Sequence, residues 1–160
     1  MKKYDLIIIG AGRASNLAAS AGKAGKRVAI IEKSTLGGTC PNRGCVPSKL
    51  LLGYAHVANA IKESNRHFID SSINSIDIKK IFEKTNTYIS KIDTIYENKF
   101  NENVDIYKGI GSFVSNNVIK VNDEQLTAPK IVIATGTRPI EAPHEKAWTS
   151  FLKLINHFAC

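Results

Sequence analysis

The chain has 160 residues, of which 43% are hydrophobic, and it carries a formal net charge of +8. This length supports one hydrophobic core, and no apolar run approaches the roughly 18 residues of a membrane-spanning helix. The lysines are scattered rather than gathered into a stripe with aromatic residues, so the charge does not indicate nucleic-acid binding. We expect a cytoplasmic protein, where a cysteine pair is catalytic more often than structural.

The N-terminal segment predicts a strand, a tight loop and a helix. Residues 4–9 are apolar apart from Asp5, a glycine-containing loop follows, and residues 16–24 are mostly small and rich in alanine, as in a closely packed helix. Gly10 permits the turn, and Gly12 lets the backbone approach a pyrophosphate at the helix N-terminus. Ser15 replaces the third glycine of this pattern, and a small side chain fits there. The candidate phosphate-binding loop comprises Gly10, Gly12, Arg13, Ala14 and Ser15.

A second strand is predicted at residues 27–32, and its last residue is an acid. Glu32 lies twenty residues after Gly12, where a carboxylate would accept hydrogen bonds from the ribose hydroxyls of a dinucleotide. Lys33 follows directly and joins the candidate site. An ordinary βαβ turn with a solvent-facing Glu32 remains the alternative.

Residues 36–49 hold two of the three cysteines and form the candidate redox centre. On an ideal helix Cys40 and Cys45 would lie about 140° apart, so a disulfide between them requires a local distortion. Residues that loosen or bend a helix surround them, namely Pro41, Gly44 and Pro47. The segment is therefore suited to a disulfide that opens and closes.

The environment expected for these cysteines favours thiol chemistry. Thr39 or Cys40 is the expected N-cap of the helix, and a thiolate near a helix N-terminus has a lowered pKa. A zinc site is one alternative, but the sequence offers no second cysteine or histidine ligand pair. A pair of ordinary buried thiols is the other alternative, and it leaves the glycine and proline residues unexplained.

Two amphipathic helices are expected after the redox centre. Pro47 begins one that extends to about residue 62 and is well buried on one side. A loop at residues 64–75 follows, and then a single long helix to Tyr96, capped by Ser75 or Asp77. The apolar stripe of the first helix comprises Leu50, Leu51, Tyr54, Val57, Ala58 and Ile61, and that of the second Ile78, Phe82, Ile89, Ile92 and Tyr96, broken at Thr85.

The C-terminal part predicts strands. From Val104 to Val121 the apolar period is two, which indicates a small antiparallel meander with a turn at residues 116–117. Residues 130–139 form an apolar strand that ends in small residues, as a buried parallel strand beside a ligand would. The fold class is therefore α/β, a Rossmann-like domain with a parallel sheet, flanking helices and a small antiparallel β-meander.

The stretch from Gly37 to Lys49 resembles the active-site signature of the flavin-dependent pyridine nucleotide–disulfide oxidoreductases, and its dihydrolipoamide dehydrogenase branch is the closest likeness. Glutathione, mycothione and mercuric reductases share this motif. The resemblance extends from the first strand to about Ser150. It implies FAD, and electron transfer among NAD(P)H, the flavin, a Cys40–Cys45 disulfide and a small-molecule or lipoyl-linked disulfide or dithiol substrate.

The resemblance also implies residue roles. Cys40 would be the interchange thiol that attacks the substrate, Cys45 would face the flavin, and Lys49 would stabilise charge near the flavin N5 edge. Gly111 would contact adenine through its backbone. Further cofactor contacts are expected from Gly38, Thr39, Cys40, Ala134, Thr135 and Gly136, and no metal site is expected.

The resemblance covers only part of the family's architecture. Residues 1–140 correspond to the N-terminal part of an FAD-binding domain, and residues 141–160 to an exit toward an NAD-binding domain. The sequence has no second glycine-rich loop for NAD(P)H. It also has no interface domain, the part through which members of the family form homodimers. Two hypotheses follow, an N-terminal piece of a disulfide oxidoreductase and a catalytically incompetent truncated FAD-binding domain. The isolated chain is expected to be inactive.

Overall fold

The computed structural model describes residues 1–137. Its elements in chain order are β1 (Lys2–Lys3), β2 (Leu6–Ile9), α1 (Ser15–Lys23), β3 (Val28–Glu32), α2 (Thr39–Arg43), α3 (Cys45–Glu63), the 3₁₀ helix η1 (Ser64–His67), α4 (Ile78–Ile89), α5 (Ile92–Glu97), β4 (Val104–Lys108), β5 (Gly111–Ser115), β6 (Val118–Val121), β7 (Glu124–Thr127) and β8 (Ile131–Ile133). Residues 138–160 fall outside this description, so the expected exit segment and Cys160 are not described.

A parallel sheet with the strand order β4-β3-β2-β8 forms the centre of the fold. In its middle, Ile7 of β2 pairs with Ala29 of β3 on one side and with Ile131 of β8 on the other. The carboxyl ends of parallel strands meet at one edge of a sheet. The segments that follow these strands therefore lie together at what we call the carboxyl edge, the usual ligand position in this kind of fold.

The two middle strands of the central sheet, β2 and β3, are covered on both faces. Ile7 and Ile9 of β2 belong to a core shared with the second sheet, whereas Ile8 between them belongs to a core shared with α1. Successive side chains of a strand face opposite sides, so a strand covered on both faces must be apolar at every position. This explains the continuous apolar runs of β2 and β3.

The second sheet has the order β1-β7-β6-β5, in which β5, β6 and β7 are an antiparallel meander and β1 joins β7 in parallel. The predicted meander and its turn at residues 116–117 are confirmed, but placing β4 in it was wrong. β4 pairs in parallel with β3, from Val28↔Val104 to Glu32↔Lys108. A period of two marks a strand in either kind of sheet, so it does not identify the partner strand.

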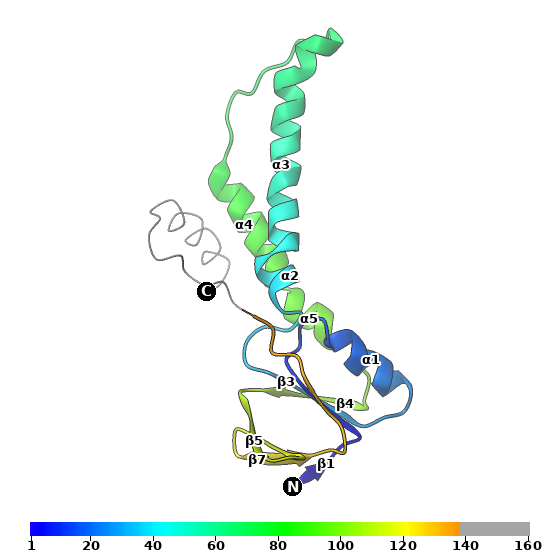
Figure 1. Cartoon of the computed structure of the whole chain (residues 1–160). Helices are drawn as coiled ribbons and strands as arrows, with labels where there is room; N and C mark the ends of the chain where they lie inside the picture. The colour runs from blue at the N-terminus through cyan, green and yellow to red at the C-terminus, as the bar shows by residue number, and fades with distance from the viewer. Residues whose placement is uncertain (138–160) are drawn as a thin grey trace.

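α3 and α4 form a helical arm that projects from the sheets (Figure 1). The expected burial of one side of α3 was wrong, because of its 19 residues only Pro47 is buried and Val57 is 61% exposed. The expected single helix to Tyr96 is two helices, α4 and α5, separated at Ser90 and Lys91. The predicted cap is correct, since the carboxylate of Asp77 accepts a hydrogen bond from the backbone N–H of Lys80. Within residues 1–137, no helix is both long and apolar enough to cross a bilayer.

Candidate functional site

The loop between β2 and α1 has the backbone geometry expected of a phosphate-binding loop. Gly10 has φ = 104°, and a Cβ there would overlap the carbonyl oxygen of Ala134, so only glycine fits. Ser15 is buried, and its hydroxyl donates a 2.6 Å hydrogen bond to the carbonyl of Gly12. The fold therefore accommodates serine as the third residue of the motif by bonding its hydroxyl within the loop. Arg13 is exposed and Ala14 is half-buried beside it.

Glu32 connects the end of β3 to this loop. Its half-buried carboxylate accepts a 2.8 Å hydrogen bond from the backbone N–H of Ala11 and a 2.9 Å bond from that of Ser34. Each carboxylate oxygen has a further lone pair, so the group can still accept ribose hydroxyls. Glu32 thus lies at the glycine loop, and Lys33 beside it is exposed.

Two other predicted segments reach the same edge of the sheet. The backbone N–H of Gly109 donates a 2.8 Å hydrogen bond to the carbonyl of Glu32, so the β4–β5 turn lies beside this residue. Gly111 follows that turn, and a Cβ on it would be 3.2 Å from Ile31 of β3. Ala134 follows β8 and donates its N–H to the carbonyl of Ile9. Thr135 and Gly136, which come next, are exposed.

The redox centre is divided between α2 and α3, and the distortion expected between the cysteines is at Gly44, where φ is −132° and ψ is −110°. The expectation of Thr39 or Cys40 as N-cap was wrong. The N-cap is Gly38, with φ = 69° and ψ = −156°, and no side chain caps α2. That backbone conformation is accessible almost only to glycine, which explains the position of Gly38.

Cys40 and Cys45 are exposed free thiols, so the structure describes the reduced form of the pair. A hydrogen bond between the two thiols is the main cause that raises the pKa of Cys40, and the positive charge of Lys49 acts weakly in the opposite direction. The expected lowering of the pKa is therefore wrong for Cys40 in the reduced pair, because the bond to Cys45 outweighs the charge. The disulfide of the oxidised protein stays a prediction.

The candidate redox centre lies directly against the predicted phosphate-binding loop. A Cβ on Gly38 would lie only 2.8 Å from the Cα of Gly12, so two glycines are in backbone contact here. The neighbouring Gly37 donates its N–H to the carbonyl of Ala11 at 2.8 Å. The predicted phosphate loop and the predicted thiol pair are therefore parts of one site.

Two residues that sequence reasoning missed hold this arrangement. The side chain of Asn42, 4% exposed, donates 2.8 Å hydrogen bonds to the carbonyls of Leu36 and Gly38. The carboxylate of Asp93 in α5 accepts a 2.6 Å bond from the backbone N–H of Leu36. The position of Asn42 between the cysteines was a usable signal, whereas Asp93 looked like any polar residue on an amphipathic helix.

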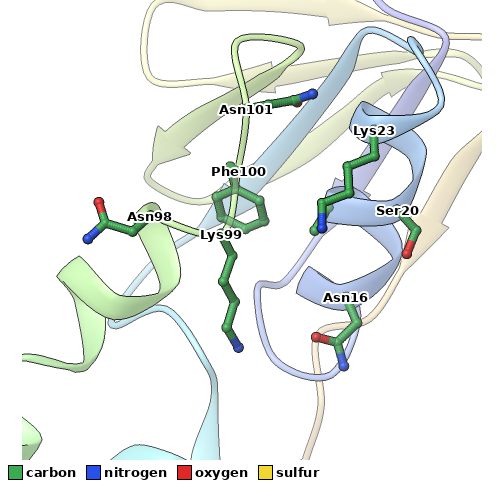
Figure 2. Close-up of a pocket in the computed structure, with 8 residues that line it drawn as sticks. Asn16, Ser20, Lys23, Asn98, Lys99, Phe100 and Asn101 are labelled. Carbon is green, nitrogen blue, oxygen red and sulfur yellow. The ribbon is translucent and has the colours of Figure 1, made fainter.

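A pocket of about 580 Å³ lies elsewhere, between α1 and residues 98–101 (Figure 2). Its lining comprises Asn16, Ala19, Ser20, Lys23, Asn98, Lys99, Phe100 and Asn101. None of these is a predicted site residue, although Asn16 directly follows Ser15 of the predicted phosphate loop.

Residues 4–157 match the family described as pyridine nucleotide-disulphide oxidoreductase. The chain belongs to this family. The dihydrolipoyl dehydrogenases of Staphylococcus aureus and Bacillus subtilis are 39% and 36% identical to it over 149 and 148 residues, 89% of this chain and 32% of each relative. A mercuric reductase of Lysinibacillus sphaericus is 35% identical over 85% of this chain and 26% of its own.

A solved structure gives the same result for the fold. The Cu(II) complex of the HOCl-induced flavoprotein disulfide reductase RclA from Escherichia coli has a TM-score of 0.70 and 29% identity, over 89% of this chain and 31% of that one. The chain thus spans about a third of the length of its relatives. The family implies FAD and NAD(P)H as cofactors, and the Glu32 carboxylate, which keeps lone pairs free beside its bonds to Ala11 and Ser34, fits the ribose of an FAD nucleotide.

Proposed function

We propose that the chain binds FAD at the carboxyl edge of the central sheet and exchanges two electrons with it through Cys40 and Cys45. In this proposal, residues 1–140 are the N-terminal part of an FAD-binding domain in a disulfide oxidoreductase of the dihydrolipoamide dehydrogenase type. The observation that supports it most is the contact between Gly12 and Gly38, because it joins the loop that precedes the thiol pair to the loop proposed for the pyrophosphate.

Each group at the edge has a distinct task in this proposal. The N-terminus of α1 and the backbone of Gly12 receive the pyrophosphate, whose negative charge the helix dipole favours. Glu32 accepts the ribose hydroxyls while its bonds to Ala11 and Ser34 keep the carboxylate oriented. The turn at Gly111 and the segment from Ala134 to Gly136 complete the nucleotide contacts. When bound, FAD would supply hydride chemistry, which no side chain provides.

The thiol pair is the electron store of the chain itself. When Cys40 and Cys45 are oxidised, one S–S bond forms, two protons leave and two electrons pass on; reduction reverses each change. Cys40 is proposed as the thiol that exchanges with the substrate and Cys45 as the thiol that faces the flavin. Lys49 is close enough to act on the charge of Cys40, which supports its proposed role beside the pair.

The wider reaction is also a proposal, since the chain spans a third of its relatives' length. The substrate would be a small-molecule or lipoyl-linked disulfide or dithiol, NAD(P)H the second cofactor, the assembly a homodimer and the location cytoplasmic. A chain with a single glycine-rich loop, assigned here to FAD, would have no NAD(P)H-dependent turnover on its own. The match to a mercuric reductase supports mercuric ion as the second candidate substrate of the same thiol pair.

Stoichiometric electron transfer tests this function. The air-oxidised 160-residue chain is mixed with one equivalent of FAD under argon, the flavin is reduced with limiting dithionite, and new thiols are counted by alkylation and mass mapping. We expect alkylation at Cys40 and Cys45 that depends on FAD. In Cys45→Ser no disulfide can form between these positions, so Cys40 should be alkylated equally with and without FAD. Equal alkylation of the parent without FAD, or reduced flavin that leaves the disulfide intact, would contradict the proposal.

A further inference from the structure

The short helix α5 is tied to the redox centre through one side chain. Asp93 accepts a 2.6 Å hydrogen bond from the backbone N–H of Leu36, a fully buried residue at the start of the redox stretch. Its other oxygen accepts a 3.0 Å bond from the ammonium group of Lys108. Asp93 therefore joins the redox stretch to a residue on a different element.

Lys108 is the last residue of β4 and pairs in register with Glu32 of β3. Its bond to Asp93 consequently fixes α5 to the carboxyl edge, beside the proposed ribose position. Glu97, one turn further along α5, also lies 4.0 Å from the ammonium group of Lys108. No described hydrogen bond connects Glu97 to the redox stretch, so these two acids share the cation but differ in their contact with the loop.

The Leu36 backbone is held at both of its polar groups. The carboxylate of Asp93 accepts a hydrogen bond from the Leu36 N–H. The side-chain amide of Asn42 donates hydrogen bonds to the carbonyls of Leu36 and Gly38. Gly38 in turn begins α2, which carries Cys40, and rests on Gly12. A path of contacts therefore runs from the sheet edge through Asp93 to the helix that carries Cys40.

We propose that Asp93 is a positioning residue that holds the Leu36–Gly38 backbone against the phosphate loop and so sets the approach of Cys40 to Cys45. The inference rests on the proposed redox role of the pair, but it concerns the chain's own residues. Without Asp93 the N–H of buried Leu36 loses its acceptor, which a native fold avoids by shifting the backbone. The shift moves the start of α2 and separates the thiols.

Thiol exchange without FAD measures this geometry directly. The reduced chain is equilibrated with oxidised glutathione, so that one protein dithiol and one GSSG give one protein disulfide and two GSH. We expect Asp93→Ala to lower this equilibrium constant about five-fold or more, since a closed disulfide requires the held geometry. Asp93→Asn keeps an oxygen acceptor for Leu36, and we expect it to restore the constant to within about two-fold of the parent.

Glu97→Gln is the matched control, because it removes the same charge from the same helix without touching the loop. We expect it to leave unchanged both the equilibrium constant and the pH midpoint of Cys40 alkylation, and Asp93→Ala to move that midpoint to lower pH. If Asp93→Ala does not fold, Lys108→Met is the variant that tests the positioning role, because it removes the bond between Asp93 and the sheet. We expect it to lower the equilibrium constant more than Glu97→Gln does.

Equal equilibrium constants for Asp93→Ala, Glu97→Gln and the parent would overturn the positioning role of Asp93. An Asp93→Asn constant as low as that of Asp93→Ala would also overturn it. If Asp93→Ala does not fold, equal constants for Lys108→Met and Glu97→Gln overturn it. These outcomes are distinct from failure of the proposed function, which is measured by FAD-dependent reduction of the pair.

Discussion

Gly12 and Gly38 touch through their backbones, although 26 positions separate them in the chain. One belongs to the loop that precedes α1 and the other to the loop that precedes α2. A side chain at position 38 would push these loops apart, and with them the proposed pyrophosphate site and the thiol pair. The contact therefore makes the redox centre and the nucleotide loop one structural unit.

Gly38→Ala should destabilise the fold by about 1–3 kcal/mol, because its backbone conformation is nearly restricted to glycine and its Cβ would lie 2.8 Å from the Cα of Gly12. The free energy of unfolding from urea titration measures this. Gly53→Ala in α3 is the control, since a Cβ there meets nothing within 4 Å. This substitution should raise the free energy of unfolding by about 0.5–1 kcal/mol. Equal stability of Gly38→Ala and the parent would show that the two loops are not packed as described.

Glu32→Ala should weaken FAD binding by about 1–3 kcal/mol, because the ribose loses its acceptor and the N–H groups of Ala11 and Ser34 lose theirs. Calorimetric titration with FAD measures the binding free energy. Glu124→Ala removes an acid that pairs with Lys2 and has no place in the proposed site, so it should bind FAD as the parent does. Unchanged affinity in Glu32→Ala would refute the role of this carboxylate.

Cys45→Ala should lower the pKa of Cys40, because the bond between the thiols is what chiefly raises it. Since the thiolate is the reactive form, Cys40 of the variant should react faster with iodoacetamide at pH 8 than Cys40 of the reduced parent. The rate of alkylation against pH, followed by mass spectrometry, gives the midpoint for each protein. A midpoint that stays or rises in Cys45→Ala would count against the described contact.

Phe68 ends η1 in a left-handed conformation, with φ = 61° and ψ = 27°, and its side chain is fully exposed. Phe68→Gly should therefore stabilise the chain by about 1 kcal/mol, because glycine adopts this conformation without strain. Phe68→Ala is the comparison, since it removes the aromatic ring but keeps the strain. Thermal unfolding in which both variants gain equally would place the effect in the ring rather than the backbone.

Local pattern predicted the parts of this fold whose cause is local. The βαβ unit, the glycine loop and the acid at the end of β3 follow from periodicity and from residues that turns require, and all are present. The break at Gly44 was predictable from the proline and glycine residues near it. Asp77 as a helix cap was also predictable, because capping depends on the residue next to the start of the helix.

Tertiary contacts decided the rest. β4 and the meander have the same period, so pairing with β3 could not be read from spacing. The apolar stripe of α3 resembles that of a buried helix, yet few of the described residues cover it. Asp93 contacts a residue 57 positions away, and no local pattern marks such a pair. The direction of the Cys40 pKa shift depends on whether the bond to Cys45 or the charge of Lys49 has the larger effect. Only the three-dimensional structure shows which of the two does.

The central claim, that FAD binds at the Gly12 loop, is tested most directly by one substitution. A Cβ on Gly12 would meet only the Cα of Gly38, at an ordinary contact distance of 3.8 Å, so Gly12→Ala should fold as the parent does. In the proposed complex the pyrophosphate lies against this stretch of backbone, so the added methyl group would narrow its approach. We predict FAD affinity reduced about ten-fold or more, with an unchanged urea midpoint. Gly12→Ala that binds FAD as tightly as the parent would contradict the account.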